Sequence, residues 1–454
     1  MKKTAVTLVS LLAVGSALAG CGSKEAATTP APTSTPVATK APEAATPAPS
    51  KAPEKVTLNL RNVLVKETQA KELARLQQVK KDVEAKVPGL TIEMVSMEEQ
   101  AHRLQRLPAE FAQGNPPEIF QLFGGSDTKK FSKTGSLLDL TPIITELGLK
   151  DKFYDLGEFT VDGKIYGLPL AGYQENVFYN KKIFADNGLQ IPKTWDELMK
   201  VCETLKAKGI QPFAFGAKDA WAITMPMNTL WVRYGGKDIT AEIQAGTKKW
   251  TDPGVVEGFK KFKELIDKGY VTKNSLALSN EQGYGEFQKG NAAMRFDGTW
   301  AGGAFTDPKF SKVTDDVGFF QFPNVGGPGD NIVNASYSSG YGYSSKVNDA
   351  QKAAIKEFIK RMYSDEEQLK QNADEGWLPA KKITIDSAKP YVKEVFAVAG
   401  AAKGSFPAFD AEVPTSVRDF IFQEAQKLVG GKVTAEQFAE NVQKAQEKAD
   451  KEKK

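Results

Sequence analysis

Alternating hydrophobic and polar residues mark the start of the folded part of the chain. Val56, Leu58 and Leu60 alternate with polar residues, as in a half-buried strand. Apolar residues spaced three and four apart then predict a helix over residues 73–83, and "PGLTIEMVSM" predicts a second strand. A helix around "RLQRLPAEFAQG" and a strand at "EIFQLF" follow. This order of strands and helices predicts a parallel α/β sheet with right-handed crossovers.

A helix with clear boundary signals is predicted further along the chain. Thr194 and Glu197 are spaced as a capping box, and Gly209 suits the C-terminal cap. The apolar face from Leu198 to Leu205 includes Cys202, which we therefore expect in the core. Similar signals predict helices within residues 251–269, 348–364 and 434–448.

The first 20 residues have the layout of a secretory signal peptide. Lys2 and Lys3 precede an apolar run over residues 5–19, which is too short for a comfortable membrane span. The sequence "LAGC", ending at Cys21, resembles the lipobox of bacterial lipoproteins, in which the cysteine thiol accepts a lipid. We expect a mature chain that begins at Cys21 and is anchored by acyl chains. An ordinary signal peptide with an incidental cysteine is the alternative.

Residues 21–55 are predicted to form a tether. Their Pro-, Ala- and Thr-rich sequence contains no aromatic side chain. Such a segment cannot bury enough apolar surface to offset its chain entropy, so we expect an extended, disordered linker.

Composition narrows the possible functions. A chain of 454 residues predicts two folded domains. The formal net charge is only +4, with Lys and Glu interspersed, so no basic face indicates nucleic acid. With His102 as the only histidine and Cys202 as the only cysteine after the tether, most zinc sites are excluded, and we expect no metal. A Cys-His or Ser-His nucleophile is also excluded, apart from one that uses His102. His102 lies in the charged helical stretch "EEQAHRLQRL", which predicts a solvated surface residue.

Several ordered motifs resemble one family. They are Gly163, Tyr166, Gly167, Pro169, Tyr179 to Lys181, Gly188 through Leu198, Gly290 through Trp300, and then "GFFQFP", "SSGYGYS" and "GWLPA". Together they resemble the extracellular solute-binding proteins of carbohydrate ABC transporters, the group typified by maltose-binding protein. The resemblance spans roughly Val56 to Lys444.

The resemblance implies a bilobed α/β fold with a hinge and a central ligand cleft. Lobe one would comprise residues 56–170 and 324–372, and lobe two residues 171–323 and 373–454. It also implies a monomer without cofactor that captures a mono- or oligosaccharide. The ligand would pass to membrane permease subunits driven by a cytosolic ATPase, while the lipid anchor holds the protein at the outer face of the bacterial cytoplasmic membrane.

A sugar site needs aromatic platforms for the C–H faces of the ring and polar groups for the hydroxyls. An unpaired desolvated polar group costs about 1–3 kcal/mol, so each hydroxyl must find a partner. We expect ligand contacts from Phe123, Ser126, Asp127, Tyr173, Glu175, Trp221, Asp297, Trp300, Tyr341 and Trp377.

Trp300 is the leading candidate because it follows Gly298 at the end of a predicted strand, at the family's usual stacking position. Asp297 could accept hydroxyl donors beside it. The alternative is a core tryptophan with a turn-forming aspartate. Trp221 follows a strand and a loop, whereas Trp231 lies in the next helical stretch and is expected in the core.

The remaining candidates each have a structural alternative. Asp127 lies in "GGSD", a sequence whose residues also favour a turn. Glu175 lies beside the expected hinge, just upstream of Tyr179 and Asn180, which we expect to be structural. Tyr341 lies between two glycines, which permit close approach of a ligand or relieve a strained strand.

Two other classes of function remain open at this point. A secreted glycoside hydrolase would also combine aromatic residues with a pair of carboxylates, although no motif marks such a pair. A surface adhesin or structural lipoprotein would share the anchor and the tether without needing the ordered cleft motifs.

Replacing Cys21 tests the predicted anchor. Without the acylated thiol, Cys21→Ser should be released into the medium or stay unprocessed at the membrane, measured by fractionation and lipid labelling. Full anchoring of the variant with its lipid label intact would contradict the lipoprotein prediction.

Overall fold

The computed structural model describes residues 55–385 and 389–452, which belong to one compact unit. The predicted signal peptide, Cys21 and residues 21–54 of the tether lie outside the described residues. Among the described residues, no helix combines the length and apolarity needed to cross a membrane.

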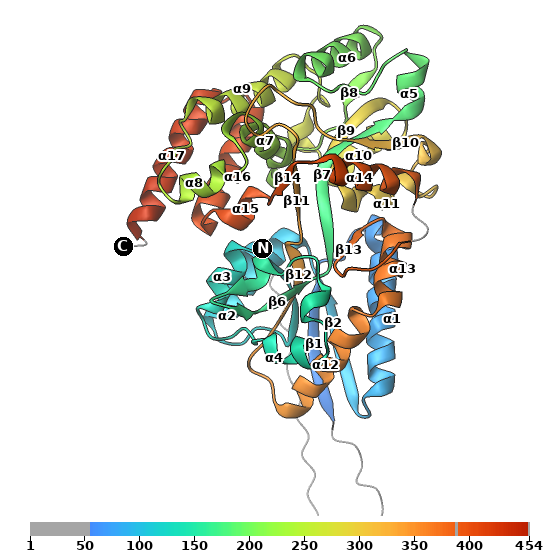
Figure 1. Cartoon of the computed structure of the whole chain (residues 1–454), viewed down its shortest axis with the longest axis vertical. Coiled ribbons are helices and arrows are strands. Elements are labelled where there is room, and N and C mark those ends of the chain that lie inside the picture. The colour runs from blue at the N-terminus through green and yellow to red at the C-terminus, as the bar shows by residue number, and fades with distance from the viewer. Residues whose placement is uncertain (1–54, 386–388, 453–454) are drawn as a thin grey trace, which may run out of the picture. The chain divides into compact units, whose positions relative to one another are not determined.

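The first sheet contains the opening of the folded chain (Figure 1). Its strands, in spatial order, are β2 (Leu90–Ser96), β1 (Val56–Asn62), β3 (Ile119–Phe123), β12 (Ser339–Tyr343) and β6 (Gly167–Pro169). Strand β1 pairs in parallel with β2 and β3, as the sequence predicts, whereas β12 runs antiparallel to both of its neighbours. A short hairpin pairs β4 (Thr160–Val161) with β5 (Lys164–Ile165).

The second sheet is built around one long strand. Its spatial order is β14 (Gly404–Phe406), β11 (Ile332–Ser336), β7 (Ala171–Asn180), β9 (Ala292–Gly298) and β8 (Gln211–Phe213). Strands β10 (Val317–Phe320) and β13 (Leu378–Pro379) pair antiparallel with β7. Because β7 directly follows β6 of the first sheet, the chain crosses between the sheets at this point.

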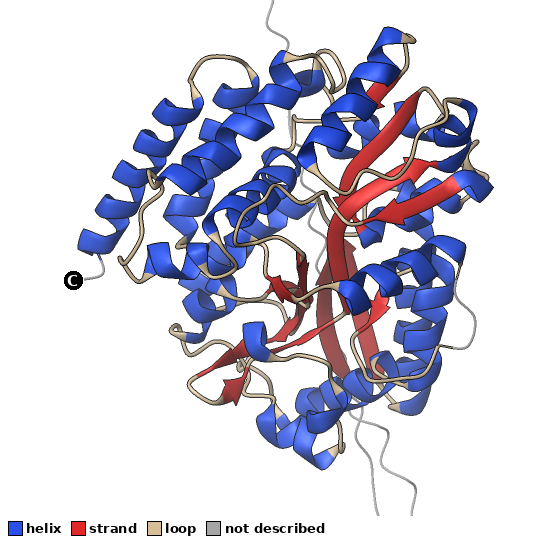
Figure 2. Cartoon of the chain, turned by 45° about the horizontal axis from the view of Figure 1, so that its top comes forward, coloured by secondary structure: helices blue, strands red, loops and turns tan. Residues whose placement is uncertain are grey.

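Helices cover both sheets (Figure 2). Around the first sheet lie α1 (Ala70–Lys86), α2 (Leu107–Ala112), α3 (Ser126–Ser132), α4 (Thr141–Glu146), α12 (Asp349–Met362) and α13 (Asp365–Glu375). Around the second lie α5 (Lys181–Asp186), α6 (Trp195–Ala207), α7 (Ala220–Gly235), α8 (Ile239–Gln244), α9 (Pro253–Asp267), α10 (Asn280–Gln288), α11 (Gly302–Thr306), α14 (Pro390–Ala401), α15 (Phe409–Glu412), α16 (Thr415–Val429) and α17 (Ala435–Glu452).

Each sheet has its own hydrophobic core. In the first, α1 packs against α12 and β2, and α12 packs against β1, so that apolar residues such as Leu76 and Phe358 are buried. In the second, α7 and α9 pack against each other through Trp231 and Phe259, whose ring centroids are 5.7 Å apart. The core position expected for Trp231 is therefore confirmed. Two lobes, each a sheet covered by helices, confirm the predicted bilobed α/β fold.

The residue ranges predicted for each lobe stay a prediction. The pairing of β11 bears on the predicted boundary between the lobes. Strand β11 lies within 324–372, a range expected in lobe one, yet it hydrogen-bonds to β7 and β14 of the second sheet.

The boundary signals of the predicted helices are confirmed. Thr194 Oγ1 accepts from the backbone nitrogen of Glu197 at 3.3 Å, which closes the capping box at the start of α6. Gly209, just past the end of α6, has φ of +74°, as a C-terminal glycine cap needs. Cys202 is fully buried among the apolar residues of this helix, so its predicted core position is also confirmed.

The surface position predicted for His102 is wrong. The side chain is fully buried, and its Nε2 lies 2.7 Å from the carbonyl oxygen of Gln121 on β3. The cause is local: residues Ala101–Arg106 form a π-helical segment, in which the 3.6-residue spacing used for the prediction does not apply. Burial lowers the pKa of His102 below its ordinary value, which favours the neutral ring.

The burial of Cys202 predicts an unreactive thiol. Desolvation raises its pKa well above the ordinary value, so little thiolate forms at neutral pH. In native protein comprising residues 55–454, a bulky maleimide should label Cys202 far more slowly than after unfolding in denaturant. Ile191→Cys, at an exposed position, is the control and should be labelled at once in the native protein. Equally fast labelling of Cys202 in the native state would contradict its core position.

Candidate functional site

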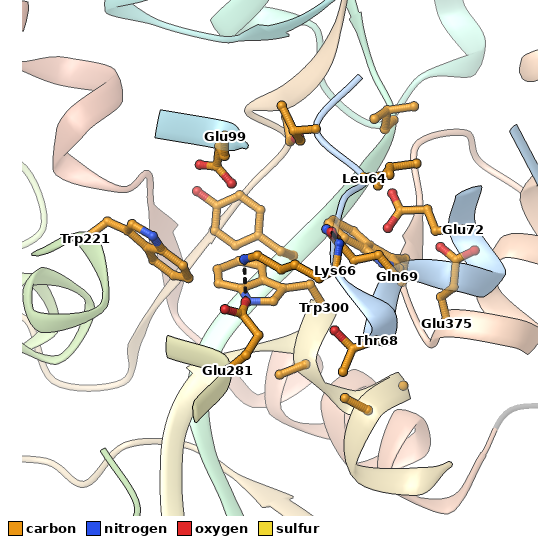
Figure 3. A pocket seen from close by; sticks show the side chains of 18 of the residues that line it. Leu64, Lys66, Thr68, Gln69, Glu72, Glu99, Trp221, Glu281, Trp300 and Glu375 are labelled. Atoms are coloured by element: carbon orange, nitrogen blue, oxygen red, sulfur yellow. Dashed lines mark hydrogen bonds and ion pairs between the residues drawn. The ribbon is translucent and has the colours of Figure 1, made fainter. Parts of the chain in front are cut away.

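A cavity of about 420 Å³ lies between the two lobes (Figure 3). One side is lined by the segment after β1, from Val63 to Glu72, and by Gln121 and Phe123 of β3. Residues from the second sheet and its helices line the other side. The volume falls within the range of small-molecule sites in proteins.

Aromatic rings form the centre of this cavity. The Trp300 ring follows β9, and its centroid lies 5.2 Å from that of Tyr173, 6.2 Å from that of Trp221 and 6.4 Å from that of Trp377. The ring lies across Gly298, where an added Cβ would approach ring carbon Cη2 to 2.2 Å. Glycine is therefore required before Trp300 for this ring position.

Six of the ten predicted site residues line the cavity. They are Phe123, Tyr173, Glu175, Trp221, Trp300 and Trp377. They come from segments up to about 250 residues apart and include every aromatic candidate except Tyr341. A ligand role for each stays a prediction.

The other four are placed away from the cavity lining. Asp127 is buried and accepts from Arg103 Nε at 2.6 Å and from Arg418 Nη1 at 3.1 Å. Ser126 Oγ donates to the backbone oxygen of Asp410 at 2.8 Å. Both residues thus connect the lobes rather than face the cavity.

Asp297 and Tyr341 are held in the interior. Asp297 is fully buried and accepts from Arg295 Nε at 2.8 Å. Tyr341 is 1% exposed and packs edge-on against Phe358. The glycine before it, Gly340, makes room for the backbone of β6 and a core ring, since an added Cβ would lie 2.3 Å from the Leu168 oxygen.

Glu175 is the buried carboxyl group beside the aromatic centre. Its side chain lies on β7, is 4% exposed and accepts from Asn334 Nδ2 at 2.6 Å. Burial, followed by the charge of Asp410, raises its pKa well above the ordinary value. The neighbouring Tyr173 hydroxyl accepts from Ser336 and Ser338, at 3.0 and 3.2 Å.

Ion pairs connect the lobes around the cavity. Lys66 of lobe one pairs with Glu281 of lobe two (Figure 3). Lys71 Nζ lies 2.6 Å from Asp307 Oδ2, and Lys309 Nζ lies 2.9 Å from Glu67 Oε1. On another side, Arg103 Nη1 donates to Asp410 Oδ2 at 2.8 Å, and its guanidinium lies 4.1 Å from the centroid of the Phe123 ring.

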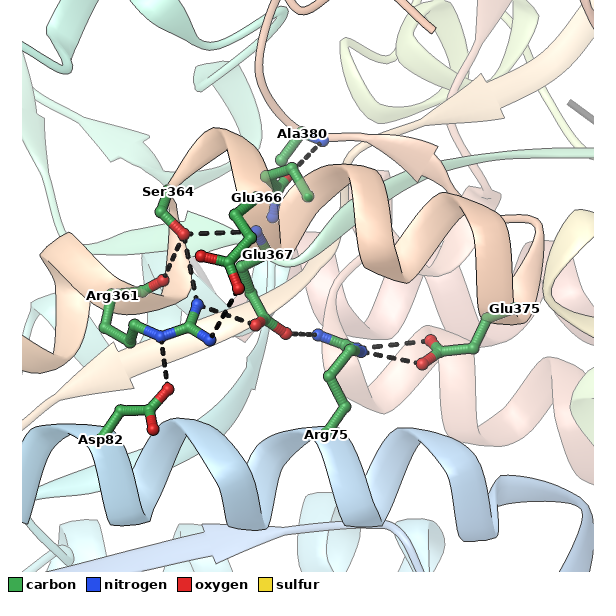
Figure 4. A network of polar contacts seen from close by, with 9 residues as sticks. Arg75, Asp82, Arg361, Ser364, Glu366, Glu367, Glu375 and Ala380 are labelled. Carbon is green, nitrogen blue, oxygen red and sulfur yellow. Dashed lines mark hydrogen bonds and ion pairs between the residues drawn. The ribbon is translucent and has the colours of Figure 1, made fainter. Parts of the chain in front are cut away.

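A buried charge network holds one edge of the cavity (Figure 4). Arg75 on α1 donates to Glu375 Oε1 at 2.8 Å and to Glu367 Oε1 at 2.7 Å. Arg361 extends the network by donating to Glu367 Oε2 at 2.9 Å and to Asp82 Oδ2 at 2.7 Å. Because Glu375 also lines the cavity, the network fixes the position of a cavity carboxylate.

Another buried carboxyl group supports the loop behind Phe123. The backbone oxygen of Glu158 accepts from Gly125 at 2.6 Å, at the start of α3. Its side-chain Oε2 is buried without a hydrogen-bond partner among the described residues. Burial is the main cause that raises the pKa of Glu158 to about 7.

Several lining residues were missed by the sequence analysis. They include Lys66, Glu72, Glu99, Asn228, Glu281, Gln371 and Glu375. One available signal was position: the segment from Val63 to Glu72 follows the carboxyl end of a parallel strand, where ligands of α/β sheets bind. Gln371 and Glu375 lie inside a helix with no motif, so no local signal marks them.

The chain matches a family of known proteins. Residues 67–369 match the sequence profile described as bacterial extracellular solute-binding protein. A solved structure named chitin oligosaccharide binding protein is 47% identical with a TM-score of 0.85, and the match covers 87% of this chain and 99% of that chain.

Curated relatives are more distant. The multiple sugar-binding protein of Streptococcus mutans is 28% identical over 264 residues, 56% of this chain and 60% of that protein. The diacetylchitobiose binding protein DasA of Streptomyces coelicolor is 27% identical over 296 residues, 63% of this chain and 65% of that protein. The chain thus spans less than two thirds of the length of these curated relatives.

The environment of Glu158 predicts a pH dependence of stability. The folded state keeps the proton of this carboxyl above pH 4.5, where the unfolded chain has lost it. The free energy of unfolding should therefore fall as pH rises from about 4.5 to about 7, and Glu158→Gln should remove on the order of 1–3 kcal/mol of this fall. Urea unfolding at pH 5 and pH 8 measures it.

Glu93→Gln, on the exposed face of β2, is the matched control and should leave the pH dependence unchanged. If Glu158→Gln and wild type show the same pH profile, the carboxyl group is hydrated and the assignment is wrong.

Proposed function

This chain belongs to the bacterial extracellular solute-binding protein family, and we propose that it captures an oligosaccharide outside the cell for an ABC importer. The aromatic centre of the cavity, formed by Tyr173, Trp221, Trp300 and Trp377, is the observation that carries this proposal. Aromatic rings stack against the C–H faces of sugars, and the polar groups around them can pair with hydroxyls.

Chitin-type saccharides are the first ligands to test. The solved structure that is 47% identical carries the name chitin oligosaccharide binding protein, and one curated relative is named for diacetylchitobiose. The cavity volume of about 420 Å³ suits an oligosaccharide of a few rings. We therefore propose β-linked N-acetylglucosamine oligomers as the probe.

Lobe closure is part of the proposal. The ligand would enter between separated lobes, and closure would bring Phe123 of lobe one toward the aromatic centre. The ion pairs of Lys66 and Lys71 with lobe two would form again on closure. The closed protein would then dock on membrane permease subunits, with its lipid at Cys21 keeping it near the membrane. In this role the protein acts without catalysis.

Titration calorimetry on residues 55–454 with a chitin trisaccharide tests the proposal. Saturable binding without release of reducing ends supports a binding protein. Cleavage of the trisaccharide would indicate a glycoside hydrolase. If no saccharide raises the melting temperature in a thermal-shift screen, sugar binding is contradicted.

Among truncations of the four aromatic residues at the centre of the cavity, we expect Trp300→Ala to cause the largest loss of affinity for the sugar. Truncation of a stacking tryptophan at a desolvated centre costs about 2 kcal/mol or more, which is about thirtyfold in Kd. Because the Trp300 side chain is only half-buried, Trp300→Ala should lower the free energy of unfolding less than Trp231→Ala does. Trp231→Ala truncates a core residue, which costs about 3–5 kcal/mol. Calorimetry and thermal unfolding of each variant check both values.

Phe396→Ala is the matched control, since this aromatic side chain is 41% exposed and does not line the cavity. It should bind as wild type does. A Trp300→Ala protein that keeps its affinity but melts much lower would place Trp300 in the core rather than in the site.

A further inference from the structure

The cavity carries more carboxyl groups than its cations can neutralise. Four cationic side chains of the described residues line it: Lys66, Lys71, Arg103 and Lys309. Each is already paired with a carboxylate of the opposite lobe. Lining carboxyl groups outside these four pairs remain, including Glu72 and Glu99, and also Glu375, which pairs with Arg75 outside the lining. The cavity therefore holds carboxyl groups that none of its lining cations pairs with.

Two of these carboxyl groups meet at one end of the cavity. Figure 3 shows the side chains of Glu72 on α1 and Glu375 on α13 beside each other. Arg75 fixes Glu375 through two hydrogen bonds, at 2.8 and 3.3 Å. No hydrogen bond or ion pair joins Glu72 to another described residue. Glu72 is thus the free acceptor at this end.

An unpaired amide lies on the same helix face. Gln371 is four residues before Glu375 on α13, so the two side chains share one side of the helix. Gln371 is 1% exposed and lines the cavity, and its Oε1 is buried without a partner among the described residues. A buried acceptor without a partner is unfavourable, and a donor on the ligand would remove this cost.

Resting on the proposed function, we propose that this end of the cavity binds a protonated amine, so that the ligand includes an amino sugar with a free amino group. An ammonium group has three donors and no acceptor, which matches an end formed by Glu72, Glu375 and Gln371. Charge-assisted hydrogen bonds to carboxylates are roughly twice as strong as neutral ones.

Nearby cations leave room for such a group. Arg75 acts on both carboxyl groups, but its Nε and Nη2 donate to Glu375 and its Nη1 to Glu367. Lys389 also acts on Glu375, but its Nζ is directed to the backbone oxygen of Asp374 at 3.3 Å and to Thr306 Oγ1 at 3.4 Å. It does not line the cavity. Burial and the charge of Glu375 raise the pKa of Glu72 in the ligand-free protein, and a bound ammonium would stabilise its ionised form instead.

Calorimetry with two matched trisaccharides tests the proposal: β-1,4-linked glucosamine and its fully N-acetylated counterpart. The two differ only in the acetylation of their three amino groups, so an effect confined to the first reports recognition of a free amine. Glu72→Gln keeps the shape and removes the charge. It should weaken the glucosamine trimer about tenfold or more and change the acetylated trimer less than about twofold.

Glu99→Gln is the matched control, because Glu99 also lines the cavity and has no hydrogen-bond partner among the described residues, but belongs to a different segment. It should weaken the glucosamine trimer much less than Glu72→Gln does. If both variants lose equal affinity for the glucosamine trimer, the effect comes from the overall charge of the cavity. That result would overturn the assignment to Glu72.

The remaining outcomes separate the two proposals. Binding of the acetylated trimer with no binding of the glucosamine trimer overturns the amine site and leaves sugar capture intact. Failure of both trimers in the wild-type protein overturns the chitin-type ligand on which the inference rests. Retained binding of the acetylated trimer by Glu72→Gln shows that this variant is folded.

Discussion

Strand β7 is buried at all ten positions and hydrogen-bonds to β9, β10, β11 and β13. A strand buried on both faces usually carries apolar residues, yet β7 has Gln174, Glu175 and Asn176 in succession. Each must find partners inside the protein. Gln174 donates to the backbone oxygen of Val395 at 3.1 Å, and Asn176 accepts from Phe322 at 2.9 Å. This pairing holds Tyr173 and Glu175 at the point where the chain passes from one sheet to the other, so the rest of the cavity is arranged around β7.

The ion pairs around the cavity differ in the free energy needed to separate them. Lys66 with Glu281, and Lys71 with Asp307, are partly exposed, and such pairs contribute about 0–1 kcal/mol each. Arg75 with Glu375 is buried within lobe one, where an unpaired charge would be costly. Asp127 with Arg418 is buried between lobes, but separating the lobes hydrates both partners together. The lobes can therefore part while each stays intact, as the proposed capture requires.

Sequence patterns within short segments predicted the helices and strands of those segments well. Alternation and spacing indicated β1, α1 and β2, and the capping residues of α6 and the burial of Cys202 followed from the sequence around them. The surface position predicted for His102 was wrong, because a π-helical segment changes which residue faces the sheet. Periodicity contains no information about such a segment.

The candidate site was only partly predictable for a related reason. Trp300 stands in a motif whose glycine is explained by the ring that crosses it. Asp127 and Asp297 stand in similar motifs, yet arginines pair with both: Arg418 from a distant segment with Asp127, and Arg295, two residues away on β9, with Asp297. Arg418 is 291 residues from Asp127, so neither the pairing nor the loss of a free carboxylate can be read from either segment alone.

The aromatic centre and the carboxyl-lined end of the cavity can serve one ligand. In the proposed complex the aromatic centre would contact the C–H faces that all sugars share, so it would supply affinity with little selectivity. Selectivity depends on polar groups that are left unpaired by the wrong ligand. Glu72 is suited to two ligand forms, because burial favours its protonated state beside a neutral ligand, and an ammonium favours its ionised state. A protonated carboxyl group can donate to the carbonyl of an acetylated sugar, and an ionised one can accept from a free amine. In the proposed complex the same residue would therefore accommodate acetylated rings while favouring an unacetylated one.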